Sequence, residues 1–350
     1  MTDEKQQEKL VTDRTSIETD WLCGMRYWWY KHAEGNGIVP ATEATELLEG
    51  RDIHADLADY AAGVPLEKLL ADIEEKVKQA AEVPDLELLY RRMGWLIAWD
   101  AWVEPRLRAE FPRNLMLEKE LVLDRDPLWI ATTPDRVVAS NSGLIVVDDY
   151  KTARSLYGWA EKWPYAIQCH IQLKAVEEEL GKKVAYGRMR AIYKGDHRDG
   201  RLTHPYVWVW KDRGGAYTPE YKTGLTRVPV WEYPGGIREW VKFCGEEIGL
   251  AQFPLSQPIF CNDRLLEDMI QARINREKAI KLGIERARTD PAFRKLLFEQ
   301  RFGQCRSSKR YPCPYLSACH NATVNQNPLG SGEYVKRTPH HELELIELED

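Results

Sequence analysis

The sequence predicts an α/β protein in which a group of strands lies within a helical surround. Apolar residues recur at helical spacing over most of residues 1–115, and the pattern changes to strand alternation from about residue 115. Charged helical patterns then return from about residue 236 to 300. We expect one integrated domain built of four segments: a helical part at 1–115, the strand-containing core at 116–213, a second helical part at 214–325, and an acidic tail at 326–350.

Composition limits the class of protein. With 350 residues and 43% hydrophobic side chains, the chain can bury a substantial core. The N-terminus is polar and the apolar stretches are short, so we expect a cytoplasmic protein that does not enter a membrane. The net charge of −6 neither supports nor excludes binding to nucleic acid, because 49 Lys and Arg residues can still gather on one face.

The first part of the chain reads as a series of helices. Ser16 opens the first, and "TEATELLEGRDIHADLADYAA" keeps helical spacing with Gly50 as an interruption. Further on, Trp95, Trp99 and Trp102 follow one another at helical intervals. A stripe of this kind indicates core packing rather than base stacking.

Strands begin near residue 115. Three are expected in sequence, "LMLEKELVL", "LWIATTPDRVVAS" and "LIVVDDYKT", and the Asn-Ser-Gly turn at 141–143 joins the last two as an antiparallel hairpin. "PYAIQCHIQLKAVEEELGKK" follows as a helix, and "VAYGRMRAIYKG" and "LTHPYVWVWKD" as strands, which gives the order β-β-β-α-β-β. Residues 213–235 are expected to form a loop rich in Gly, Pro and Tyr.

The hairpin carries the chemistry. Asp135 lies in one strand, and Asp149 and Lys151 share a face of the next while Tyr150 points away. Two carboxylates and an ammonium therefore converge, and a divalent cation is the simplest partner for them. Such a set suits phosphodiester hydrolysis, with the lysine positioning or activating the attacking water. A surface salt bridge at a strand end is the alternative.

"TPDRV", followed after the hairpin by "VVDDYKTA", resembles the signature of the PD-(D/E)XK nucleases. The resemblance implies a restriction-endonuclease-like fold, a mixed β-sheet flanked by helices. It implies catalytic roles for Asp135, Asp149 and Lys151, and magnesium or manganese held by the two aspartates with the Tyr150 carbonyl. The spacing to Lys151 selects Asp149 over Asp148, which we expect to be structural.

Three further features resemble the RecB-like branch of these nucleases. "EGRDIH" matches its Gly-x-x-x-His element and implies His54 as a metal ligand. Glu120 in "LEKEL" matches the acidic position on the preceding strand, where it would hold a second metal or water. Gln168 matches the Gln of the Gln-x-x-x-Tyr motif, which contacts DNA or orders the site. The residue four positions later is Gln172 rather than Tyr, which leaves the role of that turn open.

The seven cysteines are not expected to form disulfides in a reducing compartment. Cys23 and the set Cys305-x7-Cys313-x5-Cys319 resemble the split iron-sulfur site of CRISPR-associated RecB-like nucleases, although the usual two-residue gap is seven residues here. The resemblance implies a 4Fe-4S cluster that staples the C-terminal helical region to the N-terminus. Zinc is the alternative, with His320 replacing Cys305.

The resemblance implies a magnesium- or manganese-dependent DNase, an exonuclease on DNA ends or single strands in recombination, repair or CRISPR-type processing. The sequence has no P-loop, so we expect any unwinding of DNA to require a partner such as a helicase. Further candidate partners are an annealing protein, a CRISPR adaptation protein and a second copy of the chain. Arg136 and Arg154 are expected to meet phosphates, and Tyr157 or Trp159 to stack on bases. The alternatives are a non-catalytic nucleic-acid-binding subunit, and a zinc- or redox-responsive protein.

Overall fold

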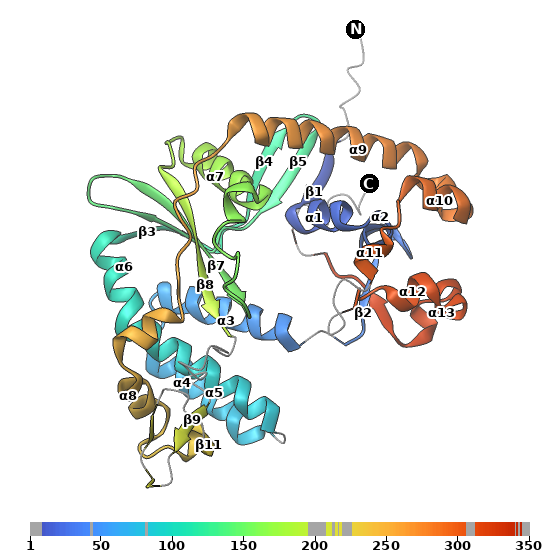
Figure 1. Cartoon of the computed structure of the whole chain (residues 1–350). Helices are drawn as coiled ribbons and strands as arrows, with labels where there is room; N and C mark the ends of the chain where they lie inside the picture. Colours follow the sequence, from blue (N-terminus) through green and yellow to red (C-terminus); the bar gives the residue numbers. More distant parts are fainter. Residues whose placement is uncertain are drawn as a thin grey trace.

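The fold is a mixed α/β arrangement of small sheets flanked by helices, as the sequence predicts (Figure 1). The computed structural model describes residues 9–42, 45–80, 83–194, 208–211, 214–215, 217–218, 226–305, 312–339, 341 and 344. Within these ranges no helix is both long and apolar enough to cross a membrane.

A four-stranded mixed sheet in the order β3-β6-β7-β8 forms the centre. Its strands are β3 (Arg113–Leu117), β6 (Arg136–Ala139), β7 (Ile145–Ala153) and β8 (Tyr186–Tyr193). β6 and β7 form the predicted antiparallel hairpin, and β8 pairs with β7 in parallel. That parallel pair requires a crossover, which the helix α7 (Ile167–Leu180) provides.

A three-stranded sheet of order β1-β5-β4 lies beside it. Its strands are β1 (Leu10–Asp13), β4 (Leu121–Arg125) and β5 (Leu128–Thr132). Two predicted continuous strands are therefore each divided between the two sheets, into β3 and β4 and into β5 and β6. The first break falls at Glu118, whose φ of 42° is left-handed, and the second lies just before Asp135. These breaks turn both acidic side chains toward one place.

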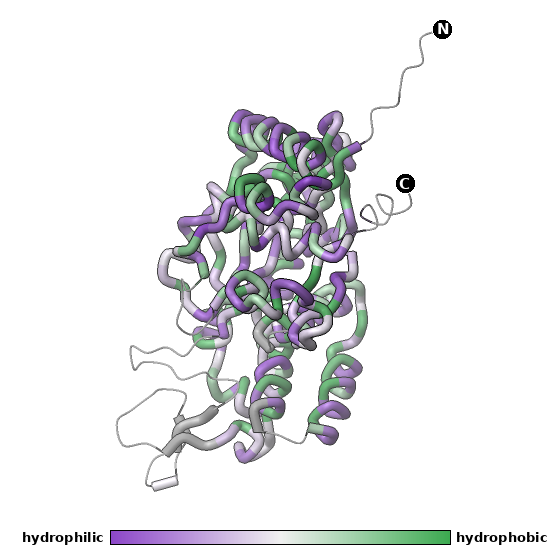
Figure 2. Tube along the Cα trace, turned by 90° about the vertical axis from the view of Figure 1, so that its right-hand side faces the viewer, coloured by the Kyte–Doolittle hydropathy of each residue, from purple (hydrophilic) through white to green (hydrophobic). Residues whose placement is uncertain are grey.

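Helices cover both faces of the central sheet. One face packs on α7, while the other packs on the N-terminal helices through residues such as Val146, Trp95 and Trp99, so the tryptophans are core residues as predicted. In Figure 2 hydrophilic and hydrophobic colours alternate along the coiled parts of the tube, as expected for helices with one packed face. The N-terminal helices are α1 (Arg14–Leu22), α2 (Gly24–Tyr27), α3 (Thr45–Ala61), α4 (Leu66–Gln79), α5 (Val83–Ala98) and α6 (Glu104–Glu110), with the π-helical turns η1 (Trp28–His32) and η2 (Trp99–Val103).

The C-terminal part returns to the N-terminus. In Figure 1 the long helix α9 runs along the top of the molecule, and the last helices lie beside α1 and α2. A two-stranded sheet pairs β2 (Ile38–Pro40) with β12 (Tyr334–Lys336), so the start of the predicted tail is ordered. The helices are α8 (Gly236–Ala251), α9 (Asp263–Thr289), α10 (Pro291–Leu297), α11 (Phe302–Cys305), α12 (Leu316–His320) and α13 (Ala322–Gln326), followed by η5 (Leu329–Ser331).

A third small sheet, at the bottom of the molecule in Figure 1, combines β9 (Trp208–Lys211), β10 (Tyr217–Thr218) and β11 (Thr226–Pro229). The expectation of a loop over 213–235 is therefore wrong where β10, β11 and the 3-10 turn η4 (Val230–Glu232) form. The chain pairs there although Gly and Pro are frequent. The predicted strand at 202–212 is described only from residue 208.

Candidate metal centre

The end of β7 presents alternate residues to opposite faces. Asp149 and Lys151 share one face, as predicted, and Lys151 Nζ lies 2.5 Å from Asp149 Oδ2. Lys151 Nζ also donates to the backbone carbonyl of Tyr150 at 2.9 Å. The Tyr150 ring points to the other face, where it is buried against Trp99. The ammonium therefore lies between a carboxylate and a carbonyl oxygen.

Two amides of α7 hold the same carboxylate. Gln168 Nε2 donates to Asp149 Oδ2 at 2.9 Å, and Gln172 Nε2 donates to Asp149 Oδ1 at 2.8 Å. The two glutamines are four residues apart and therefore lie on one face of the helix. Both are at most 3% exposed. Gln172, at the position where the motif has Tyr, thus takes part in holding Asp149, a role that sequence reasoning did not assign.

The helix α3 brings His54 to the site. His54 Nδ1 lies 3.2 Å from Asp135 Oδ1, while Asp135 Oδ2 accepts a hydrogen bond from the Tyr150 amide. One turn before His54, Gly50 faces β7, and a Cβ there would lie 3.3 Å from Thr152 Oγ1. Gly50 therefore allows α3 to approach β7 closely. α3 continues through Gly50, so this residue is a packing contact rather than the predicted interruption.

The acidic residue that joins His54 and Asp135 is Glu118 rather than the expected Asp149, which, like the Tyr150 carbonyl, contacts Lys151 Nζ instead. Ligand atoms of His54, Glu118 and Asp135 all lie within 4.8 Å of one another, and they are the only group of at least three His, Cys, Asp or Glu side chains found this close among the described residues. Glu120, expected to hold a second metal or water, instead accepts a hydrogen bond from His341 Nδ1 at 2.9 Å. The left-handed backbone at Glu118 follows the end of β3, and it is this side chain, not that of Glu120, that lies near Asp135.

The electrostatics of the group are those of crowded carboxylates. Partial burial and the neighbouring charge of Asp135 raise the pKa of Glu118 to about 8. Burial opposes ionisation of Asp135, but His54 and Lys151 outweigh it and lower its pKa to about 2. Burial and Asp135 raise the pKa of Asp149. A cation would relieve this repulsion, and two carboxylates with one imidazole fit a divalent ion.

A pocket of about 570 Å³ opens beside the group. It is lined by Leu47, Gly50, Arg51, His54, Ala55, Glu118 and Thr152. Because His54 and Glu118 form part of its wall, a molecule in this pocket would contact a cation held by the group. The pocket therefore connects the candidate metal centre to solvent.

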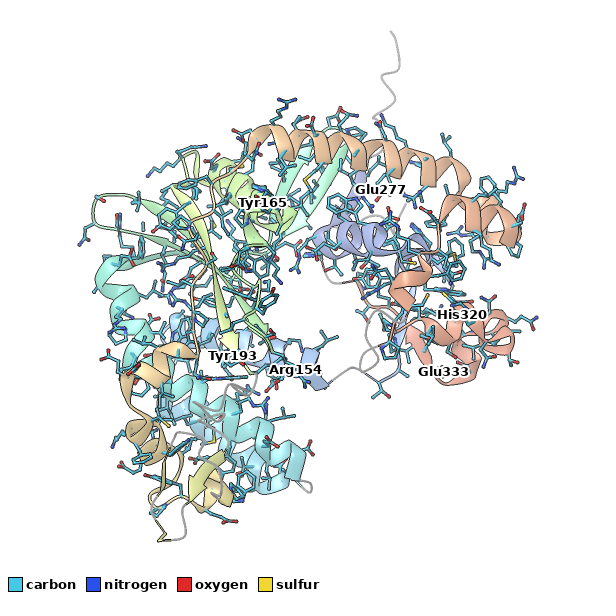
Figure 3. All side chains as sticks on the ribbon, in the orientation of Figure 1. Arg154, Tyr165, Tyr193, Glu277, His320 and Glu333 are labelled. Carbon is cyan, nitrogen blue, oxygen red and sulfur yellow. The ribbon has the colours of Figure 1, made fainter. Side chains whose placement is uncertain are left out.

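Three predictions for neighbouring residues have different outcomes. Arg136 does not face solvent: it is 2% exposed and its guanidinium pairs with Glu104 at 2.8 and 3.0 Å, so the expected phosphate contact is wrong. The residue follows Asp135 in the chain and therefore points to the opposite face. Arg154 is exposed at the end of β7 (Figure 3). Asp148 is buried and pairs with Arg188 at 3.2 Å, in agreement with a structural role.

The four predicted cluster cysteines lie in one lobe, formed by α1, α2, α11, α12 and α13, but they do not form a ligand group. Cys23 accepts from the Arg301 amide at 3.4 Å, and Cys319 from Trp29 Nε1 at 3.2 Å. The Cys313 amide donates to the Cys305 carbonyl at 3.0 Å. Within the described ranges no three of their sulfurs lie within 4.8 Å of one another. A single zinc ion holds its thiolates about 3.8 Å apart, given bonds of about 2.3 Å in a tetrahedron, so no three of them are preformed around one zinc ion.

The zinc alternative with His320 is not preformed either, because His320 belongs to no close group of three ligands among the described residues, and its Nε2 lies 3.2 Å from Gln300 Nε2. Burial raises the pKa of the Cys319 thiol to about 12, and the neighbouring thiols at Cys313, Cys23 and Cys305 add to the shift. The four cysteines are thus electrostatic neighbours. Cys169 and Cys244 are buried and Cys261 is half-buried, and the raised pKa of each is that of an unreactive thiol.

No protein family matches this chain, and no curated protein is significantly similar to it. The site geometry therefore carries the functional argument.

Proposed function

We propose that this chain is a magnesium- or manganese-dependent deoxyribonuclease with a restriction-endonuclease-like core. The observation that carries the proposal is the grouping of His54, Glu118 and Asp135 beside the Lys151–Asp149 pair. These residues come from four separate segments, so their convergence is not a consequence of sequence proximity. Surface acids alone would not require an imidazole and a fixed ammonium at the same place.

The roles follow from the contacts. His54, Glu118 and Asp135 would hold the cation, which when bound would polarise a phosphate and acidify a bound water. Lys151, fixed by Asp149 and the Tyr150 carbonyl, would orient the attacking water and offset negative charge on the phosphate. Gln168 and Gln172 keep Asp149 in place. We propose DNA as the substrate and exonuclease action on ends or single strands, with a helicase or other recombination protein as partner.

The cysteine site is a separate part of the proposal. The described structure has the four cysteines in one lobe, and we propose that they hold an iron-sulfur cluster, with zinc as the alternative. The visible absorption of anaerobically purified protein tests this, because sulfur-to-iron transitions give broad absorption and a brown colour while zinc gives neither. A colourless protein containing no iron contradicts the cluster.

The nuclease is tested with end-labelled linear DNA and circular DNA, single- and double-stranded, incubated with manganese or magnesium. We expect degradation that requires metal and is lost in Lys151→Ala, with circles spared if the enzyme needs an end. Lys174→Ala is the matched control, since Lys174 forms ion pairs on the exposed side of α7. Binding to DNA without any cutting would contradict the nuclease and favour a non-catalytic binding subunit.

A further inference from the structure

We propose that residues 154–165, between β7 and α7, form a binding surface for single-stranded DNA, an inference that rests on the proposed nuclease and specifies its substrate. We call this segment the rim. It begins three residues after Lys151 and ends three residues before Gln168. Both flanking residues contact Asp149, so the two ends of the rim are fixed at the candidate metal centre.

The rim turns its tryptophans inward and its tyrosines outward. Trp159 and Trp163 are each 6% exposed and pack edge to face, with ring centroids 5.5 Å apart. Tyr157 is 98% exposed and Tyr165 is 78% exposed. The tryptophans belong to the core beneath α7, so they order the backbone that presents the tyrosines. Figure 3 shows Tyr165 at the start of α7.

Cations accompany the exposed aromatic rings. Arg154 and Lys162 are exposed on the rim itself, and Lys162 Nζ lies 4.2 Å from the centroid of Trp163. Partial desolvation lowers the pKa of Lys162, and of the charges around it Glu18 raises this pKa while Arg14 and Lys151 lower it. The rim itself carries Arg154, Lys162 and Glu161, a net charge of +1, and the nearby Arg14 is paired with Glu18 at 3.1 Å.

This combination favours a single strand over a duplex. Aromatic side chains stack on bases whose faces are free, whereas in a duplex those faces are already stacked on their neighbours. Phosphates need cations near the rings, which the rim supplies. A strand stacked on Tyr157 and Tyr165 would pass Lys151, because the rim starts where the β7 residues of the site end.

The test separates binding from cleavage. Affinity for fluorescein-labelled oligo(dT) is measured by anisotropy with EDTA present, for the native protein and for Tyr157→Ala/Tyr165→Ala. Each lost stacking contact should weaken binding by roughly 5- to 150-fold, while affinity for a blunt duplex stays unchanged. Tyr157→Phe/Tyr165→Phe should bind oligo(dT) like the native protein, because a phenyl ring still stacks. Phe243→Ala removes an aromatic ring that is 43% exposed on α8, away from α7 in Figure 1, and is the matched control.

Native affinity for oligo(dT) in the double Ala variant would contradict the proposal that the rim binds single-stranded DNA. An equal loss of affinity for oligo(dT) and for the duplex would contradict it as well. The nuclease is judged separately, by cleavage with manganese. Absence of cleavage together with tyrosine-dependent binding would contradict the nuclease and leave the binding surface standing. Cleavage by a protein whose affinity for oligo(dT) does not depend on either tyrosine would support the nuclease and contradict the binding surface.

Discussion

At the scale of single residues, the site depends on how one buried carboxylate is held. Asp149 is 1% exposed and lies between an ammonium and two amides, which compensate the cost of burying its charge. Removing one donor leaves part of that charge unsatisfied. Gln172 contributes as directly as Gln168 does, although only Gln168 belongs to a motif that the sequence resembles.

We therefore expect Gln172→Leu to lower the free energy of unfolding by about 1–3 kcal/mol and to reduce cleavage at least tenfold. Urea unfolding and initial cleavage rates measure the two effects. Gln271→Leu makes the same change on the exposed side of α9 and should alter stability by less than about 0.5 kcal/mol. A Gln172→Leu variant as stable and active as the native protein would contradict the role assigned to the amide.

His32 gives a pH-dependent prediction. Burial, helped by the neighbouring Lys31 and Arg273, lowers its pKa from 6.5 to about 3. Below pH 6.5 the imidazole of His32 therefore binds a proton in the unfolded chain, whereas in the folded chain it stays neutral until about pH 3. The free energy of unfolding consequently falls as the pH drops from 6.5 to about 3. In urea unfolding between these pH values, His32→Phe should show a slope smaller by up to about 1.4 kcal/mol per pH unit. Identical slopes would contradict a neutral buried His32.

At the scale of elements, local sequence signals were enough to predict three parts of the fold. These are the hairpin of β6 and β7, the crossover helix α7, and the helical stretch that carries Trp95 and Trp99. The Asn-Ser-Gly turn and the alternation along β7 placed Asp149 and Lys151 correctly. Glu118 could not be predicted in this way, because its position depends on a left-handed residue between two sheets. The pairing of β3 with β6 and of β1 with β5 joins strands that are far apart in the chain, and strand periodicity does not specify such pairs.

Gly50 sets the distance between α3 and β7. Gly50→Val would place its branched side chain against Thr152, push α3 away and move His54 from Asp135. We expect at least tenfold weaker manganese binding in calorimetry. Asp59→Val, on the exposed side of the same helix, adds the same β-branched residue without facing β7 and should retain the affinity. Native affinity in Gly50→Val would show that the close approach is not needed.

At the scale of the whole molecule, α9 connects two cores. Leu266, Ile270 and Ile274 pack in the core beneath α7, whereas Ile280 and Ala287 pack in the core that contains Cys23. Buried charges reinforce the connection between α9 and α1. Arg273 is 2% exposed and its Nη1 donates to Asp20 at 2.9 Å, and Arg276 Nε donates to the same carboxylate at 2.8 Å. The two cores should therefore unfold together.

Asp20→Ala tests this connection, because it leaves a buried guanidinium with less compensation. We expect a loss of about 3–5 kcal/mol in the free energy of unfolding, with a single transition in urea. Glu18→Ala removes the partly exposed pair with Arg14 and should cost less than about 1 kcal/mol. Two separate transitions in the native protein would contradict a molecule joined by α9.

The most direct test of the central claim compares two glutamates two residues apart. Manganese binding by calorimetry and DNA cleavage are measured for Glu118→Gln, Glu120→Gln and the native protein. We predict that Glu118→Gln loses manganese binding and cleavage, because Glu118 lies with His54 and Asp135, whereas Glu120→Gln keeps both. Loss in Glu120→Gln with retention in Glu118→Gln, or no manganese binding by the native protein, would contradict the metal centre.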